Sequence, residues 1–202
     1  MSTPSTTSLT LYNTTINIYI RSFNLLHTLL TQAQSHLPAS SISSLPSARL
    51  TPDMYPLHSQ IIIASNTALL FASRVAPHLF ASSPFEPQDH LNPSTTLADL
   101  FSVVDKTLTT LRAIRPDDLE VGTSGADDDD DETKMMEIMI GGDTPFRSNA
   151  VGMAMGVALP NIFFHVVTAY GILRREGVPL GKKVYLGPFL EGNNIPKQEE
   201  KA

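Results

Sequence analysis

The sequence contains no cysteine. Disulfide bonds, thiolate metal sites and cysteine nucleophiles are therefore excluded together. Charged residues make up only 17% of the chain, and no cluster of lysine or arginine stands out, so nucleic acid and anionic membranes are not expected as partners. We find no apolar run of the ~18 residues that a membrane span needs, and residues 1–7 lack the pattern of a signal peptide. These observations predict a cytoplasmic protein.

The sequence does contain enough apolar material for a core. Hydrophobic residues make up 42% of the 202 residues, and the mean hydropathy is −0.01, which argues against wholesale disorder and against wholesale membrane insertion. Much of the net charge of −6 comes from the acidic run 127–132. This run lacks the spaced ligands and the glycine of a calcium-binding loop, so we predict a solvated surface loop there.

Four segments repeat apolar residues at intervals of three and four, the pattern of an amphipathic helix. They cover approximately residues 9–37, 53–79, 96–115 and 148–175. Asp53 is the expected cap of the second helix, and Thr96 with Asp99 forms a reciprocal cap of the third. Pro160 is expected to kink the last helix, and Gly177 to end it.

Between the third and fourth helices, Met136, Ile138 and Ile140 alternate with Met135, Glu137 and Met139, and Gly141 and Gly142 follow. This pattern predicts a short β-hairpin. The fold class is therefore all-α, a four-helix bundle with a β-hairpin inserted before the last helix. We expect a disordered N-terminus over residues 1–8, a single bundle domain over 9–187 and a flexible tail over 188–202. The clustered methionines of 135–155 are expected to pack the hairpin against the last helix.

Two blocks of sequence carry a resemblance to a known family. The first reads ARLTPDMYPL over residues 48–57 and continues with Gln60 and Ile61. The second reads LPNIFFHVVTAY over 159–170 and continues through 177–187. In both blocks the chain resembles the family called domain of unknown function 1993, which is similar to the DinB and YfiT-like four-helix bundles. Many of those bundles depend on a metal.

The resemblance implies where a metal would be held. In the metal-binding relatives one histidine lies on the second helix and two lie four residues apart on the last helix. Here the last helix carries Asn161 and His165, and the second helix offers His58 or Gln60. An amide oxygen is a poor substitute for an imidazole toward a transition metal. We therefore expect no metal and no other cofactor.

Candidate site residues concentrate on the last helix. Asn161, His165 and Thr168 fall on one side of it, directly after Pro160, and form a polar row beside an expected kink. We predict that Asn161 and His165 line an interior polar pocket. His165, Asn161 and Tyr170 are the candidate catalytic residues, and the candidate ligand-binding residues are His58, Gln60, Tyr55, Thr168 and His27. The plainer alternative is a packed core histidine whose two ring nitrogens are satisfied by Asn161 and a hydroxyl group.

Three functions follow from these residues. The first is a protein that binds a small organic molecule in the interior pocket. The second is a cofactor-independent acid/base enzyme acting on a small organic substrate, such as a metabolite cyclase or isomerase, with His165 transferring the proton. The third, least favoured because of Asn161, is a DinB-like metal-dependent enzyme in which His27, His58 and His165 converge. His90, in a loop, is expected only to be solvated, and a homodimer is left open.

Overall fold

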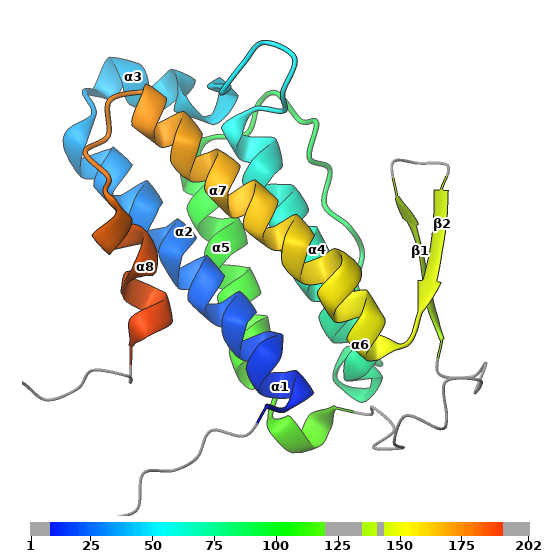
Figure 1. Ribbon diagram of the computed structural model, residues 1–202. Helices are drawn as coiled ribbons and strands as arrows, with labels where there is room; N and C mark the ends of the chain where they lie inside the picture. The colour runs from blue at the N-terminus through cyan, green and yellow to red at the C-terminus, as the bar shows by residue number, and fades with distance from the viewer. Residues whose placement is uncertain (1–8, 120–134, 141–143, 192–202) are drawn as a thin grey trace, which may run out of the picture.

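The computed structural model describes residues 9–119, 135–140 and 144–191. Four long helices form a bundle (Figure 1): α2 (Ile16–His36), α4 (Leu57–Val75), α5 (Leu97–Ala113) and α7 (Leu159–Arg175). Helix α4 packs against α5 and α7, and α2 packs against the same two helices. The predicted all-α four-helix bundle with a hairpin before the last helix is confirmed.

The apolar stripes face one another and form one core. On α2 the stripe buries Ile16, Tyr19, Phe23, Leu26 and Leu30, each no more than 1% exposed. Each large apolar side chain removed from water in this way contributes roughly 1.5–3 kcal/mol. Periodicity therefore predicts which face of each helix turns toward the core.

The first predicted helix is broken near its start. Helix α1 (Leu11–Thr14) is separated from α2 by Thr15, whose φ of −125° and ψ of −83° are not helical. The Thr15 hydroxyl donates to the carbonyl of Leu11 at 2.5 Å, an alternative to the regular backbone ladder that threonine can offer. The expectation of one uninterrupted helix over 9–37 was therefore wrong at this point.

The second helix begins later than predicted. Pro56 is its N-cap, with ψ at 170°, and the helix starts at Leu57. Asp53 does not cap it, because its carboxylate accepts a hydrogen bond from the Thr51 hydroxyl within the preceding loop. The helix ends at Val75 and is followed by a 3-10 turn, η2 (Pro77–Phe80). The third helix is capped as predicted, since Thr96 and Asp99 form the reciprocal capping box of α5.

The last predicted helix has three parts. Asn149 caps α6 (Ala150–Met153) by accepting from the backbone N–H of Gly152. A π-helical segment, η5 (Ala154–Ala158), follows, and α7 then begins with Pro160 in its first turn. Pro160 has no N–H to donate into the preceding turn. The irregularity expected around this proline takes the form of the wider π-helical turn.

The end of α7 is a Schellman motif. The backbone N–H of Val178 donates to the carbonyl of Leu173 at 3.0 Å, and that of Gly177 donates to Arg174 at 3.1 Å. Gly177 has a φ of 91°, a left-handed conformation that glycine adopts at little cost. The predicted stop at Gly177 is confirmed.

The hairpin pairs β1 (Met136–Ile140) with β2 (Thr144–Ser148) in antiparallel register, Met136 opposite Ser148 and Ile140 opposite Thr144. It stands beside the end of the bundle that carries α6 (Figure 1). The predicted turn at Gly141 and Gly142 and the predicted acidic loop at 127–132 lie outside the described residues. The same holds for the expected disorder of 1–8.

Helix α8 (Lys182–Leu190) extends the packed structure past the expected boundary at 187. It lies against α2, where Arg21 donates to the carbonyls of Pro188 at 3.3 Å and Phe189 at 2.5 Å. The remaining helical pieces are α3 (Ala39–Ser44), η1 (Leu45–Ser47) and η3 (Pro116–Asp118).

The helical run Ala150–Arg175 corrects one sequence expectation. Its length and the mean hydropathy of 1.7 of an 18-residue window within it would allow it to cross a membrane, and 39% of that window is buried inside the bundle. Isolated polar residues such as Asn161 and His165 do not lower the average below that level. Because the run packs against α2 and α4, its apolar composition fits a helix that forms part of the core.

Candidate functional site

A chain of hydrogen bonds connects the start of α4 to the middle of α7. Gln60 donates from Nε2 to the carbonyl of Tyr55 at 2.8 Å, and its Oε1 lies 2.7 Å from Nδ1 of His165. Gln60 is 1% exposed and His165 is 7% exposed. The contact therefore spans a buried seam between two packed helices.

This chain fixes where the protons are. A carbonyl oxygen only accepts, so Tyr55 requires the NH₂ group of Gln60, and that choice turns Oε1 toward His165. Because Oε1 also only accepts, Nδ1 of His165 must carry the proton. The neutral imidazole then has its lone pair on Nε2. Nε2 receives no hydrogen bond from the described residues. Among these residues, Tyr19 Oη is the one fully enclosed side-chain polar atom without a partner. Nε2 of His165 is therefore accessible to solvent.

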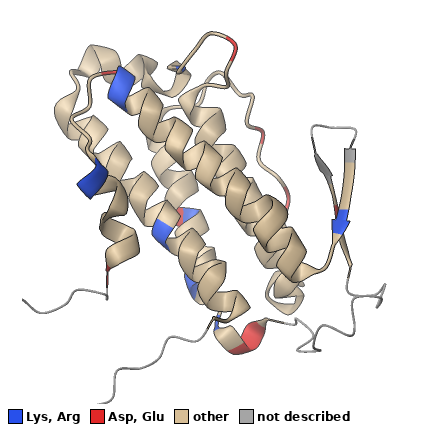
Figure 2. Ribbon diagram, viewed as in Figure 1, with Lys and Arg blue, Asp and Glu red and all other residues tan. Residues whose placement is uncertain are grey.

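His165 is held neutral by its surroundings. Burial, together with a smaller contribution from charge repulsion by His90, lowers its pKa to about 4. No aspartate, glutamate, lysine or arginine occurs from Asn149 to Leu173 or from Leu57 to Ser73, and Figure 2 shows both helices free of charged residues over most of their length. The seam therefore offers polar atoms without fixed charge.

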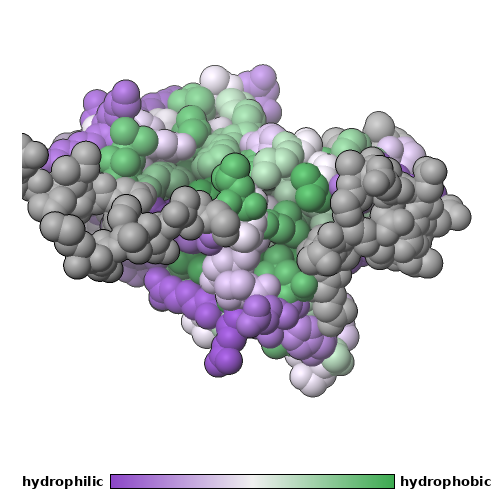
Figure 3. Space-filling model, turned by 60° about the horizontal axis from the view of Figure 1, so that its bottom comes forward, coloured by the Kyte–Doolittle hydropathy of each residue, from purple (hydrophilic) through white to green (hydrophobic). Residues whose placement is uncertain are grey.

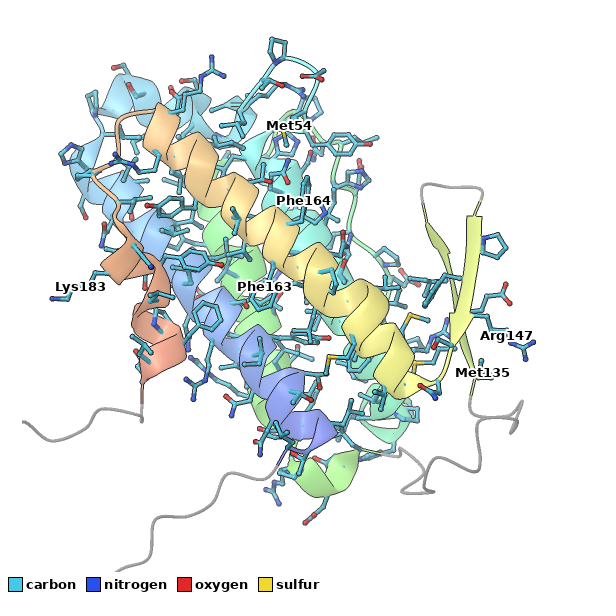
Figure 4. The ribbon with its side chains drawn as sticks, viewed as in Figure 1. Met54, Met135, Arg147, Phe163, Phe164 and Lys183 are labelled. Atoms are coloured by element: carbon cyan, nitrogen blue, oxygen red, sulfur yellow. The ribbon has the colours of Figure 1, made fainter. Side chains whose placement is uncertain are left out.

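Aromatic side chains surround the exposed side of this seam. Phe164 is 55% exposed and contacts the His165 ring edge-on at 5.3 Å, and Tyr55 contacts the His90 ring in the same way at 5.5 Å. Phe163 and Phe164 lie on opposite sides of α7 (Figure 4), with Phe163 toward α8 and Phe164 on the side of α4. An aromatic rim beside one acceptor nitrogen is a recognisable binding feature.

Asn161 does not meet His165. Its Nδ2 donates to Oγ1 of Thr67 at 2.7 Å, and Thr67 in turn donates to the carbonyl of Ile63 at 2.9 Å. Asn161 and His165 thus make two separate cross-links along the α4–α7 seam, one turn apart on α7 and about two turns apart on α4. The alternative in which Asn161 satisfies the His165 ring is wrong, because Gln60 does so.

Two further candidate residues on α7 make their contacts away from the His165 ring. The Thr168 hydroxyl donates to the carbonyl of Phe164 in its own helix at 2.8 Å, so it is satisfied without a ligand. The Tyr170 ring packs edge-on against Tyr185 of α8 at 5.9 Å. This contact places Tyr170 on the α8 side of the helix, and the structure does not bring it together with His165.

The expected convergence of three histidines does not occur. His58 is buried and donates from Nδ1 to the carbonyl of Pro46 in η1 at 2.9 Å. His27 lies on α2 beside α5, where its ring packs on Phe101 at 5.4 Å and its Nε2 is 3.7 Å from Asp105. Each of these histidines faces a different neighbour, because each is on a different side of its helix.

Sequence reasoning missed His90 and Thr67. His90 lies in the loop after η2, and Ser59 of α4 holds its carbonyl with a 2.5 Å hydrogen bond. Thr67 lies on the outer half of α4, two turns from Gln60. A loop histidine 75 positions before His165 carries no periodic signal. Thr67 could have been found, since it is the polar residue seven positions after Gln60 on the same face.

The described residues do not fit the three-histidine metal site of the DinB-like relatives. No group of three or more histidine, aspartate or glutamate side chains suited to a metal occurs among them. His165 keeps one free nitrogen, and Asn161, which stands where a second histidine would be, is bonded to Thr67. One free imidazole nitrogen and an amide that already makes a hydrogen bond provide too few ligands for a transition metal.

The two sequence blocks that carried the family resemblance meet in space. The loop before α4 is held to the end of α7 by Arg175, whose Nη1 donates to the carbonyls of Arg49 at 2.5 Å and Leu50 at 2.8 Å. The first block also supplies Tyr55 and Gln60, and the second supplies His165. Together the blocks build the seam and fix the loop that covers its end.

Comparisons with known proteins agree with the fold described above. A family profile described as "Domain of unknown function (DUF1993)" matches residues 11–186. The crystal structure of a DinB family member protein from Shewanella denitrificans is similar, with a TM-score of 0.67 and 26% sequence identity. The match covers 93% of this chain and 94% of that one. A search of curated proteins finds no match.

Proposed function

We propose that this chain, which belongs to the DUF1993 family and has a DinB-like fold, binds a small organic molecule through Nε2 of His165. The observation that carries the proposal is the fixed tautomer of a buried, neutral histidine. Gln60 occupies Nδ1–H at 2.7 Å, and Nε2 is left as an acceptor without a partner among the described residues. A ligand with an O–H or N–H donor would satisfy it.

The character of the ligand follows from the rim. Phe164 and Tyr55 expose about half of their surface beside His165 and His90. Aromatic rings favour edge-on or offset contact with another ring. The absence of fixed charge along the seam disfavours a strongly charged ligand. The class that fits best is a small aromatic or apolar molecule bearing one hydrogen-bond donor.

Binding is better supported than acid/base catalysis at the same atom. A general base works best when its pKa is near the working pH. The His165 pKa of about 4 makes Nε2 a good hydrogen-bond acceptor and a weak base near neutral pH. Tyr170 and Asn161, the other candidate catalytic residues, are bound elsewhere. The enzyme alternative therefore keeps only one of its three candidate catalytic residues, His165, free for proton transfer.

The test uses phenol as the probe and anisole as its control. Phenol carries a donor on an aromatic ring, and anisole has the same ring without the donor. Protein labelled with ¹⁵N in histidine is titrated with each, and the Nε2 resonance of His165 is followed. We expect a saturable shift with phenol and none with anisole, while the exposed His36 does not respond.

A variant pair completes the test. His165→Phe should lose phenol binding measured on the phenol signals, and His36→Phe should keep it, with circular dichroism confirming that both fold. Equal responses to phenol and anisole would overturn the proposal. So would phenol binding that survives His165→Phe.

A further inference from the structure

A second feature lies along the same seam, at the opposite end of α4. A cleft opens where the hairpin meets the end of α4 and the π-helical segment, with a cavity volume of about 30 Å³. It is lined by Thr67, Leu70, Phe71, Arg74, Met136, Ile138, Met153, Val157 and Ala158. Figure 3, in which this end of the molecule comes forward, shows hydrophobic residues reaching the surface there.

The lining is apolar except for Thr67 and Arg74. The Thr67 hydroxyl is already occupied, since it donates to Ile63 and accepts from Asn161. Arg74 is exposed and is the one charged residue of α4. It makes no hydrogen bond or ion pair with the residues that the structure describes. The cleft thus combines apolar walls with the guanidinium of Arg74, which has no partner among the described residues.

The walls can adapt to a guest. Met136 of β1 and Met153 of α6 both line the cleft, and methionine fills irregular gaps with several low-energy shapes. Val157 and Ala158 belong to the π-helical segment, a type of irregularity that often marks functional sites. An apolar cavity of this size does not hold water well, because water needs two to four polar partners.

The hairpin wall lies close to two glycines, Gly152 and Gly156. A Cβ at Gly152 would collide with the Oγ of Ser148, the last residue of β2, and Gly156 lies under the ring of Phe146. A side chain at Gly152 would force the Ser148 hydroxyl to turn away, whereas one at Gly156 would only reach ordinary contact with the Phe146 ring at 3.5 Å. The cleft is a defined contact between two elements.

From this juxtaposition we propose that the cleft binds the alkyl end of an amphipathic carboxylate, with the carboxylate paired to Arg74. The guanidinium fork matches a carboxylate with two parallel hydrogen bonds. A cavity of roughly 150 Å³ holds a whole benzene ring, so a cleft of 30 Å³ accepts the last carbon atoms of a chain and leaves the remainder in its open mouth. A carboxylate suits apolar surroundings better than a doubly charged phosphate, which costs more to desolvate.

Arg74 also has a simpler role, which the test must separate. It lies in the last turn of α4, where a cation stabilises the helix through its dipole. That effect needs no ligand and no cleft. Binding of a carboxylate requires both the charge and the apolar walls, so it responds to the tail of the ligand as well as to its head.

The test follows the methyl groups of ¹³C-methyl methionine by NMR while hexanoate is added to the full-length chain. We expect saturable shifts at Met136 and Met153, which line the cleft, and none at Met54, which is in the loop before α4. Acetate, which has no tail, and hexanol, which has no charge, should each produce much smaller shifts. Arg74→Gln should weaken hexanoate binding by roughly tenfold or more.

Lys106→Gln is the matched control, because Lys106 is an exposed cation of α5 away from the cleft; it should bind hexanoate like the unaltered chain. Hexanol binding equal to that of hexanoate, or an unchanged affinity in Arg74→Gln, would overturn the proposal. Tighter binding of hexyl phosphate than of hexanoate would overturn the carboxylate assignment. The reporters here are methionine methyls and those of the phenol test are histidine nitrogens, so either proposal can fail alone.

Discussion

Nδ1 of His165 and Oε1 of Gln60 lie 2.7 Å apart, although 105 residues separate them in the chain. Through this contact, the position of a backbone carbonyl determines which ring nitrogen of His165 carries the proton. The carbonyl of Tyr55 orients the amide of Gln60, and the amide selects the tautomer of the imidazole. Gln60 is therefore a positioning residue for the free nitrogen of His165.

Gln60→Met tests this relationship. The variant keeps the volume of the side chain and removes both hydrogen bonds, so the buried Nδ1–H of His165 loses its partner. We expect a loss of about 1–3 kcal/mol in the free energy of unfolding, measured by urea denaturation. Gln34→Met, at an exposed position on α2, should change it by less than about 0.5 kcal/mol. Similar values for both variants would show that the bond is not stabilising.

His165 should make the protein less stable in acid. Its pKa is about 4 in the folded chain and 6.5 when freely solvated, so the unfolded chain takes up the proton first as the pH falls. The stability that the neutral ring contributes is complete above pH 6.5 and is lost between there and pH 4, by about 3 kcal/mol. Denaturation at several pH values should show this slope, and His165→Phe should flatten it. An equal slope in the variant would assign the acid sensitivity to other groups.

Tyr19→Phe should stabilise the chain. Tyr19 is fully buried, its ring packs edge-on against Phe71 at 5.7 Å, and its hydroxyl has no partner among the described residues. Burial accordingly raises its pKa. Removing an unpaired hydroxyl while keeping the ring should gain about 1 kcal/mol, or roughly 2–4 °C in Tm. Tyr55→Phe, at a half-exposed ring, should leave Tm unchanged. A lower Tm for Tyr19→Phe would mean that the hydroxyl bonds a buried water.

Two glycines provide a matched pair for backbone strain. An added Cβ meets nothing within 4 Å at either Gly177 or Gly181, but only Gly177 has a positive φ, at 91°. Gly177→Ala should therefore cost about 1–2 kcal/mol. Gly181, the N-cap of α8, has a φ of −134° that alanine also adopts, so Gly181→Ala loses only a favoured cap residue and should cost about 0.5 kcal/mol. Thermal unfolding of both variants measures the difference, and equal losses would contradict the strain argument.

The absence of a metal stays a prediction. It rests on Asn161, which is bonded to Thr67, and on the single free nitrogen of His165. Protein purified without a histidine tag should carry no stoichiometric zinc, nickel or iron. Elemental analysis that finds close to one such ion per chain would contradict it, and would point to ligands that the described residues do not supply.

The apolar pattern predicted the four long helices because each buries one stripe, and a stripe is readable as periodicity. The breaks were harder to predict. Thr15 interrupts the first helix through a hydroxyl-to-backbone bond, and the later start of α4 depends on the loop that positions Pro56. Both are decided by local competition for backbone groups, which the apolar pattern does not record.

For the site, the sequence identified His165 and Gln60 but not their pairing. The helix faces predicted that His165 points inward but left open which residue of the second helix meets it. The rotation of α4 against α7 decided that Gln60, and not His58, meets the ring. His27 and Tyr170 were assigned to the site because position on a stripe does not say which neighbouring helix a side chain faces. The cytoplasmic location and the homodimer stay predictions.

The clamp between Arg175 and the carbonyls of Arg49 and Leu50 joins positions 126 and 125 residues apart. During synthesis, the first three bundle helices are made before α7 exists. Until α7 docks, Gln60 has no His165 to orient, and the loop before α4 lacks the two hydrogen bonds from Arg175. The α4–α7 seam can therefore form only after α7 has been made, and a chain cut short before α7 would keep Gln60 but lack His165 and the proposed site.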